Sequence, residues 1–234
     1  MDKLIHKTIM SSMCKNPAFD RMVLIQKNTQ IARTNLLLLK ILLNDLDLRG
    51  IFLSINRPYH YMKYLLNMHD IEHGGLLFMD TVSEISGEHF ERSKGVLFTK
   101  GPFNPELFGS LQAKVYPEND DNAIDLESYH FFMFDSIASL ANYRSLQGIR
   151  NVLNAAFTLF ERSSIRVFMS VDRDGYPEIY QTISQFENHE IYLCDDLISF
   201  RTDKRMKRIK NLVKNSLKCL VIPKEGDIRG TAVG

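Results

Sequence analysis

Apolar and polar residues follow two different periods along the chain. Short, nearly continuous apolar runs are typical of strands that are covered on both faces of a sheet. Longer segments whose apolar residues recur three or four positions apart are typical of helices that pack by one side. The pattern predicts strands at 21–26, 51–55, 76–79, 96–99, 129–134, 165–171, 190–194 and 219–222. It predicts helices at 2–15, 34–46, 59–68, 104–116, 145–162, 177–186 and 202–217, and a polar loop at 83–95.

Because these strands and helices alternate, we expect an α/β fold with a mostly parallel sheet and helices on both of its faces. The leucines of 34–46 cover nearly the whole circumference of that helix, which predicts burial on more than one side. No internal repeat or low-complexity linker divides the chain. We therefore expect one domain at 21–223, preceded by a helical segment at 1–20 and followed by a flexible tail at 224–234.

Composition and charge exclude several classes of protein. The chain has 234 residues, of which 44% are hydrophobic and 24% charged, as in ordinary globular domains. Its net charge of +1 gives the whole molecule no bias toward nucleic acid or membrane. The three cysteines show no C-x-x-C spacing, which argues against a disulfide framework or zinc site. With no signal-peptide pattern and no apolar run of about 18 residues, we expect a soluble cytoplasmic protein without a membrane span.

The octet KNTQIART, residues 27–34, lies between an expected strand and an expected helix. In many α/β proteins this junction holds the phosphate-cradling loop G-x-x-x-x-G-K-[ST]. Here Lys27 and Ala32 occupy the glycine positions, Arg33 occupies the lysine position, and only Thr34 keeps its type. The octet is either an altered phosphate site or an ordinary strand-to-helix turn.

The order of further segments resembles the RecA-type ATPase core, in particular its archaeal KaiC-like branch. The resemblance rests on the 22–46 unit, on IFLSINRPYHYMKYLLNMHDI with LLFMDTVSEISG, and on HFFMFDSIASLANY at 130–143, an apolar strand that ends in Asp-Ser. The segment 95–116 is also similar. The likeness covers roughly residues 20–195. It implies a RecA-like three-layer αβα fold.

The resemblance also implies ATP chemistry, for which this chain lacks two elements. The loop glycines are absent, and a left-handed conformation costs a non-glycine residue about 1–2 kcal/mol. The segment after the second strand reads Ser-Ile-Asn-Arg-Pro and has no glutamate to activate water. Because both elements are missing, we expect an inactive relative of the ATPases, without a cofactor, that acts as a regulatory or scaffold protein by binding another macromolecule.

Two alternatives remain open at the strand ends. Lys27, Arg33 and Thr34 either bind an anion at the start of the 34–46 helix, or Thr34 caps the helix while Arg33 is solvated. Asp135 and Ser136 either hold magnesium or end a strand and cap the following turn. If the anion-binding and magnesium-binding interpretations hold, the chain is a nucleotide-binding protein with a non-standard loop. Its ligands are then ATP and magnesium. Asp80 also ends a strand at this edge, so we expect its carboxylate to face the crevice in which open α/β sheets bind ligands.

Two other groups of residues are candidates for binding. His69 and His73 have a spacing that suits a shared metal on a helix, but no third ligand is identifiable, so no metal is expected. The segment 201–218 holds eight basic residues and one acid, with an apolar stripe at helical spacing. It is either an amphipathic helix with a solvated basic face or a site for an acidic partner, nucleic acid or anionic lipid. The candidates there are Arg201, Lys204, Arg205, Lys207, Arg208 and Lys210. We expect a monomer or homodimer rather than a hexameric ring.

Overall fold

The computed structural model describes residues 21–25, 31–87, 95–101, 124–142, 146–160, 163–186, 189–193 and 219–223. Its strands are β1 (Arg21–Ile25), β2 (Gly50–Ser54), β3 (Leu76–Asp80), β4 (Val96–Phe98), β5 (Phe131–Phe134), β6 (Arg166–Val171), β7 (His189–Leu193) and β8 (Cys219–Pro223). Its α-helices are α2 (Ile31–Lys40), α3 (Tyr59–Met68), α4 (Ser83–Ser86), α6 (Leu146–Phe160) and α7 (Pro177–Ile183). One π-helical turn, Ile41–Asp45, extends α2, and 3-10 turns lie at Leu126–Ser128 and Ile137–Asn142.

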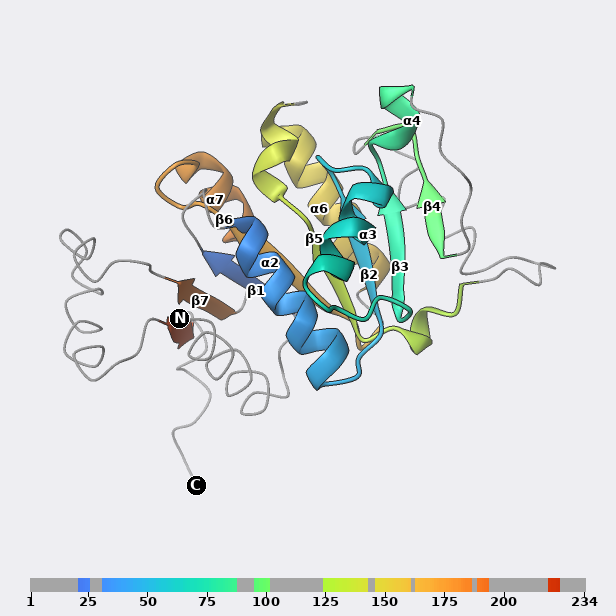
Figure 1. Ribbon diagram of the computed structural model, residues 1–234. Helices are drawn as coiled ribbons and strands as arrows, with labels where there is room; N and C mark the ends of the chain where they lie inside the picture. The colour runs from blue at the N-terminus through green and yellow to red at the C-terminus, as the bar shows by residue number, and fades with distance from the viewer. Residues whose placement is uncertain are drawn as a thin grey trace.

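The described strands form one sheet in the order β4-β3-β2-β5-β6-β1-β7-β8 (Figure 1). Neighbouring strands run parallel throughout, apart from the antiparallel pair of β7 and β8. All five residues of β2 and all four of β5 are buried, as expected of parallel strands that are covered on both faces. The prediction of a mostly parallel sheet is confirmed.

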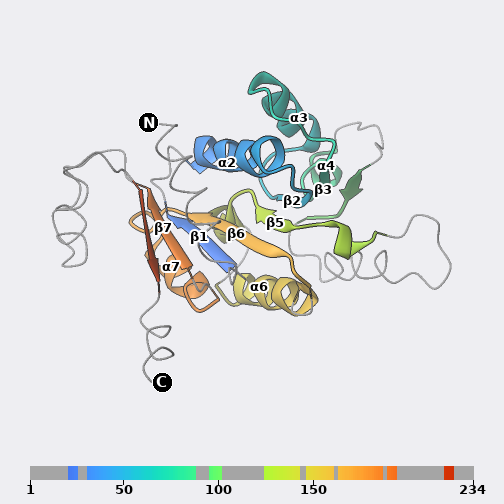
Figure 2. The same ribbon diagram turned by 90° about the horizontal axis from the view of Figure 1, so that it is seen from below.

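Helices cover both faces of the sheet, which makes three layers. Figure 2 shows α2 and α3 on one side and α6 and α7 on the other. On the α2 side, leucines of α2 pack with Met62 and Leu66 of α3 against Phe52 of β2. On the opposite side, Ile149 and Leu153 of α6 pack against the alternate residues of the strands. The period of two along each strand therefore divides the core into two halves.

The helix predicted at 34–46 begins three residues earlier, at Ile31. Ile31 is itself buried, so the helix gains apolar contact by starting there instead of at the polar Thr34. Its last turn, Ile41–Asp45, is π-helical, and the amide of Leu46 donates to the carbonyl of Ile41 over 3.0 Å. Leu38 and Leu39 are completely buried. The expected burial of the leucines of this helix is confirmed.

Other predicted boundaries agree with the structure to within a few residues, with one correction. The segment 83–95 was predicted as a polar loop, yet Ser83–Ser86 form the short helix α4, because the side chain of Asp80 accepts hydrogen bonds from its first amides. The helices predicted at 2–15, 104–116 and 202–217 and the predicted tail at 224–234 lie outside the described residues. None of the described helices has the length and apolarity needed to cross a membrane.

Candidate functional site

The carboxyl ends of β2, β3 and β5 lie side by side, because these strands are neighbours in the parallel sheet. Asp80 is the last residue of β3, Asp135 directly follows β5, and Arg57 lies three residues after β2. Open α/β sheets bind their ligands outside the carboxyl ends of the strands. This edge, with the side chains that meet there, is therefore the candidate functional site.

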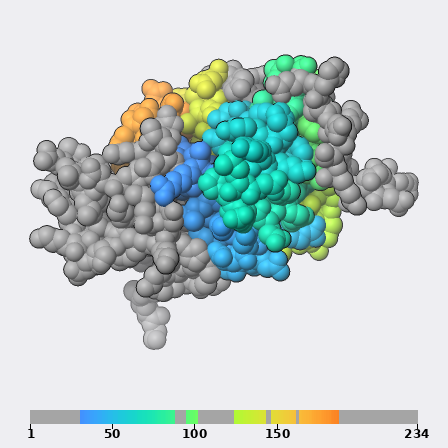
Figure 3. All heavy atoms as spheres, viewed as in Figure 1, coloured from blue at the N-terminus to red at the C-terminus, as the bar shows by residue number. Residues whose placement is uncertain are grey.

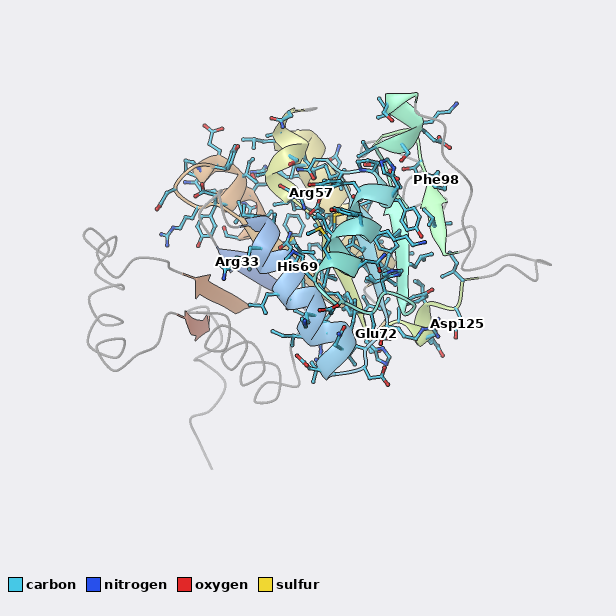
Figure 4. All side chains as sticks on the ribbon, in the orientation of Figure 1. Arg33, Arg57, His69, Glu72, Phe98 and Asp125 are labelled. Atoms are coloured by element: carbon cyan, nitrogen blue, oxygen red, sulfur yellow. The ribbon has the colours of Figure 1, made fainter. Side chains whose placement is uncertain are left out.

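Arg57 and Asp135 form an ion pair at this edge; Figure 4 labels Arg57. Nη1 of Arg57 lies 3.4 Å from Oδ1 of Asp135, and the same nitrogen lies 3.8 Å from Sδ of Met62 on α3. The side chain of Asp135 is 1% exposed and that of Arg57 is 21% exposed. The guanidinium thus stands between the buried carboxyl group and the solvent-facing side of the site.

Asn35 of α2 contacts the same aspartate from the helix layer. Its Nδ2 donates a hydrogen bond to the backbone carbonyl of Asp135. Oδ1 of Asn35 and Oδ2 of Asp135 are buried and have no hydrogen-bond partner within the described part of the chain. Oγ of Ser170 is likewise buried and has no hydrogen-bond partner within the described part of the chain. Met133 of β5 is paired with Phe168 of β6, and Asp135 and Ser170 each lie two residues beyond that pair. Buried polar atoms are normally paired, so this spot retains unmet hydrogen-bonding capacity.

The surroundings of Asp135 act on its pKa in opposite directions. Burial raises the pKa of this carboxyl group above its ordinary value, because the charged form loses its hydration. The charge of Arg57 and the nearby side-chain amide of Asn35 lower it, but the net shift is upward. The folded protein therefore binds this proton more tightly than the unfolded chain does, and ionising Asp135 costs stability.

We expect the substitution Asp135→Asn to stabilise the protein relative to the natural chain increasingly as the pH rises. A carboxyl group with a raised folded-state pKa contributes its full stability below its unfolded pKa and loses it as the pH passes through its folded pKa. Asparagine has no such titration. The check is the free energy of unfolding of both proteins in urea from acid to neutral pH. Arg57→Met should move this loss of stability to higher pH. If the free energy of unfolding of both variants differed from that of the natural chain by an amount independent of pH, this account would be contradicted.

The carboxyl group of Asp80 has a structural role at this edge, because it binds backbone and side-chain groups of the protein. Its carboxyl group is completely buried and accepts four hydrogen bonds: from the amide of Tyr59 (2.7 Å), the amide of Val82 (2.8 Å), and the amide (2.9 Å) and hydroxyl (2.6 Å) of Ser83. It thereby joins the first residue of α3 to the start of α4. The expectation that Asp80 faces a ligand crevice has no support in these contacts.

Ser136 takes part in a chain of polar contacts next to the ion pair. Asn56 Nδ2 donates to Ser139 Oγ over 3.1 Å, and Ser139 Oγ donates to Ser136 Oγ over 2.9 Å. The amide of Ser139 also donates to the carbonyl of Ser136 over 3.1 Å. These bonds close the turn that leads into the 3-10 helix Ile137–Asn142. Whether Ser136 caps this turn or holds magnesium stays a prediction.

The residues predicted from the octet are placed differently from the expectation. Arg33 and Thr34 lie inside α2, on its exposed and buried sides respectively, so the interpretation of Thr34 as the helix cap is wrong. Lys27 lies outside the described residues.

The sequence analysis missed Asn35 as a partner of Asp135. It mentioned the segment that contains Arg57 only because a glutamate is missing there. The position of Arg57 shortly after a strand, at the ligand-binding edge, was the signal that pointed to a role for this residue.

Of the two remaining sequence candidates, the structure describes the histidine pair. His69 and His73 lie beyond the end of α3, and Nε2 of His73 is 3.1 Å from Oδ1 of Asn67. Within the described residues, no group of three or more His, Cys, Asp or Glu side chains is arranged to hold a metal ion. The basic segment 201–218 lies outside the described residues.

Comparisons with known proteins identify the fold. No protein-family model matches the chain, and no curated protein matches its sequence. An uncharacterised protein from Pyrococcus horikoshii, crystallised with an unknown peptide, is similar in structure with a TM-score of 0.58 and 12% identity, over 80% of this chain and 84% of that one. A KaiC-like protein from the same archaeon has a TM-score of 0.51 and 15% identity, over 74% of this chain and 71% of that one. Together with the sheet and its two helix layers, these likenesses show that the chain has a RecA-like three-layer αβα fold, similar to that of a KaiC-like protein.

Proposed function

We propose that this chain is a catalytically inactive RecA/KaiC-like domain that works as a regulator or scaffold by binding another macromolecule. The observation that carries the proposal is the ion pair of Arg57 and Asp135. In the ATPases that the sequence resembles, the corresponding aspartate helps to hold magnesium. In this chain its buried carboxyl group already faces a cation.

Magnesium suits this environment poorly. The ion prefers ionised oxygen ligands in octahedral geometry and keeps several of its waters. Asp135 is almost fully buried, and its pKa is raised by that burial. The guanidinium of Arg57 lies 3.4 Å from Oδ1 and repels a second cation there. Asp80 offers no substitute, because its carboxyl group accepts four hydrogen bonds from the protein.

The described segment that follows β2 also holds no carboxylate that could activate water. The resemblance implies a glutamate after the second strand, which removes a proton from the attacking water. Among the described residues of that segment, Arg57 is the one whose side chain reaches Asp135. Arginine stays protonated in proteins and has no acceptor, so it cannot act as that base. In this proposal the described residues of the site supply neither a suitable magnesium ligand nor a base for hydrolysis.

A binding role remains compatible with everything described. The similar Pyrococcus protein of unknown function was crystallised with a peptide, and binding of this kind is what the proposed role requires. The basic segment 201–218 suits an acidic partner by its charge.

The test is incubation of the purified chain with ATP and magnesium, with release of inorganic phosphate as the readout. We expect no release above the protein-free blank for the natural chain, for Asp135→Asn, or for the surface control Asp125→Ala. Release that persists in Asp125→Ala and is abolished in Asp135→Asn would show catalysis at this site and refute the proposal.

A second candidate, nucleotide binding without turnover, is favoured by buried atoms of Asn35, Asp135 and Ser170 that have no hydrogen-bond partner among the described residues. In this version the binding residues are those expected from the sequence for an ATP-type ligand: Lys27, Arg33, Thr34, Asp135 and Ser136. The same samples decide it by thermal denaturation, because a ligand at 100 times its dissociation constant adds about 2.7 kcal/mol of stability. An unchanged melting temperature at millimolar nucleotide would eliminate this candidate.

A further inference from the structure

Three buried oxygen atoms near the carboxyl edge of the sheet have no hydrogen-bond partner among the described residues: Oδ1 of Asn35, Oδ2 of Asp135 and Oγ of Ser170. Each of the three residues is only 1% exposed. They come from different elements, because Asn35 lies in α2, Asp135 directly follows β5, and Ser170 lies in β6. Buried polar atoms are normally paired, so the three oxygens indicate a partner that is not one of the described residues.

The register of the sheet and the position of α2 bring these side chains together. Met133 of β5 and Phe168 of β6 are paired, and both belong to the half of the core that lies under α2. Asp135 and Ser170 each lie two residues further along. Since successive strand residues alternate between the faces of a sheet, both side chains lie on the α2 side. Helix α2 contacts β6, and Nδ2 of Asn35 donates to the backbone carbonyl of Asp135.

The helix layer covers this spot. Figure 3 shows atoms of α2 (blue) and of α3 (cyan to green) at the surface on this side of the molecule. With an exposed fraction of 1%, the three residues have almost no contact with bulk solvent. A ligand that binds all three oxygens within the folded protein must therefore be small.

The hydrogen-bonding character of the three oxygens suits a water molecule. The amide oxygen of Asn35 and an ionised carboxylate oxygen of Asp135 only accept, whereas the hydroxyl of Ser170 donates and accepts. One water can donate to both acceptors and accept from the hydroxyl, which gives the three bonds typical of a buried water. If Asp135 is protonated, the water accepts from the carboxyl group and donates to the hydroxyl instead. A metal cation suits the spot less, because the guanidinium of Arg57 lies 3.4 Å from Oδ1 of Asp135 and repels it.

We propose that Asn35, Asp135 and Ser170 bind one buried water molecule, which joins α2 to the ends of β5 and β6 beneath the candidate functional site. The inference goes beyond the proposed function, because the water pairs these oxygens whether or not the chain releases phosphate from ATP. It also accounts for the same oxygens without a nucleotide. The water and the release of phosphate are measured separately, so either proposal can fail alone.

The first test is a crystal structure of the full natural chain at a resolution that shows ordered water. We expect one density peak within hydrogen-bonding distance, about 2.5–3.2 Å, of all three oxygens. The proposal is overturned by the absence of this peak, by a side chain of the segment 26–30 bound to these oxygens, or by a direct hydrogen bond between Asp135 and Ser170. Soaking the crystal in thallium(I) tests for a monovalent cation, and an anomalous signal at the peak would refute its assignment to water.

The second test counts long-lived water molecules in solution by magnetic relaxation dispersion of water deuterons. Ser170→Val removes the hydroxyl and adds a methyl group beside the proposed water, so this variant should hold one long-lived water fewer than the natural chain. Thr182→Val is the matched control, because Thr182 is also buried but its hydroxyl already donates to the carbonyl of Glu178 over 2.9 Å. It should hold as many as the natural chain.

Far-UV circular dichroism establishes that both variants are folded, and the crystal structure of the natural chain decides the question if either is not. An equal count in the natural chain and Ser170→Val, or an equal loss in Thr182→Val, would contradict the proposal.

Discussion

Replacing Asp80 with alanine should lower the free energy of unfolding by about 3–5 kcal/mol. The carboxyl group of Asp80 is completely buried and accepts hydrogen bonds from three backbone amides and one hydroxyl. Alanine would leave these donors without a partner where water has little access. Each buried donor that loses its partner costs about 1–3 kcal/mol. Urea denaturation at neutral pH measures the effect.

The matched control is Asp125→Ala. Asp125 also caps a short helical segment, Leu126–Ser128, but it is exposed, and its carboxyl group accepts one described hydrogen bond, from the amide of Glu127 at 3.0 Å. Loss of such a cap costs about 1 kcal/mol, since water replaces the lost partner. If Asp80→Ala cost no more than Asp125→Ala, the network around Asp80 would not be the support for α3 and α4 that its geometry indicates.

Replacing Phe131 with alanine should cost about 3–5 kcal/mol, and its neighbour Gly50 offers a way to assign that cost. Phe131 is completely buried, and it pairs with Gly50 across β5 and β2. Its ring lies over the glycine so closely that an added Cβ on Gly50 would stand 2.1 Å from Cζ of Phe131. Gly50→Ala must therefore displace a ring that also packs edge-on against Phe168, at about 1–3 kcal/mol.

The double variant tests whether the ring is the cause. The three atoms nearest to the added Cβ all belong to this ring, so Gly50→Ala with Phe131→Ala should cost less than the sum of the two single changes. Gly74→Ala is the control, because an added Cβ there has no atom within 4 Å, and it should change stability by less than about 0.5 kcal/mol. Strict additivity in the double variant would show that the contact between Gly50 and Phe131 is not the source of the cost.

Local pattern was enough to predict most elements of the described fold. The helix at Tyr59–Met68 was predicted at its observed bounds, and α6 was predicted within two residues of its observed ends. The buried parallel strands were recognisable because a strand covered on both faces has no polar side to present. The start of α2 and the existence of α4 were missed. Both depend on contacts, the burial of Ile31 and the side chain of Asp80, that composition alone does not display.

The candidate site was only partly visible in the sequence. Asp135 was identified from its position at the end of an apolar strand, but Arg57 and Asn35 are 78 and 100 residues away from it in the chain. They meet it because β2 lies next to β5 and because α2 crosses the same edge. Neither neighbour can be read from local spacing, since any of the apolar strands fits any place in a parallel sheet equally well by hydrophobicity.

The sequence by itself determined that this chain alternates strands and helices around a parallel sheet, and that the glycines and glutamate of the resembled ATPases are missing. These features depend on residue type and short-range periodicity, which the local chain specifies. Only the tertiary structure decided that a guanidinium faces the buried Asp135 and that Asn35 contacts it from the helix layer. The reason is physical: strand order and burial arise from the packing of distant segments, and the charge environment of a side chain depends on which of those segments become its neighbours.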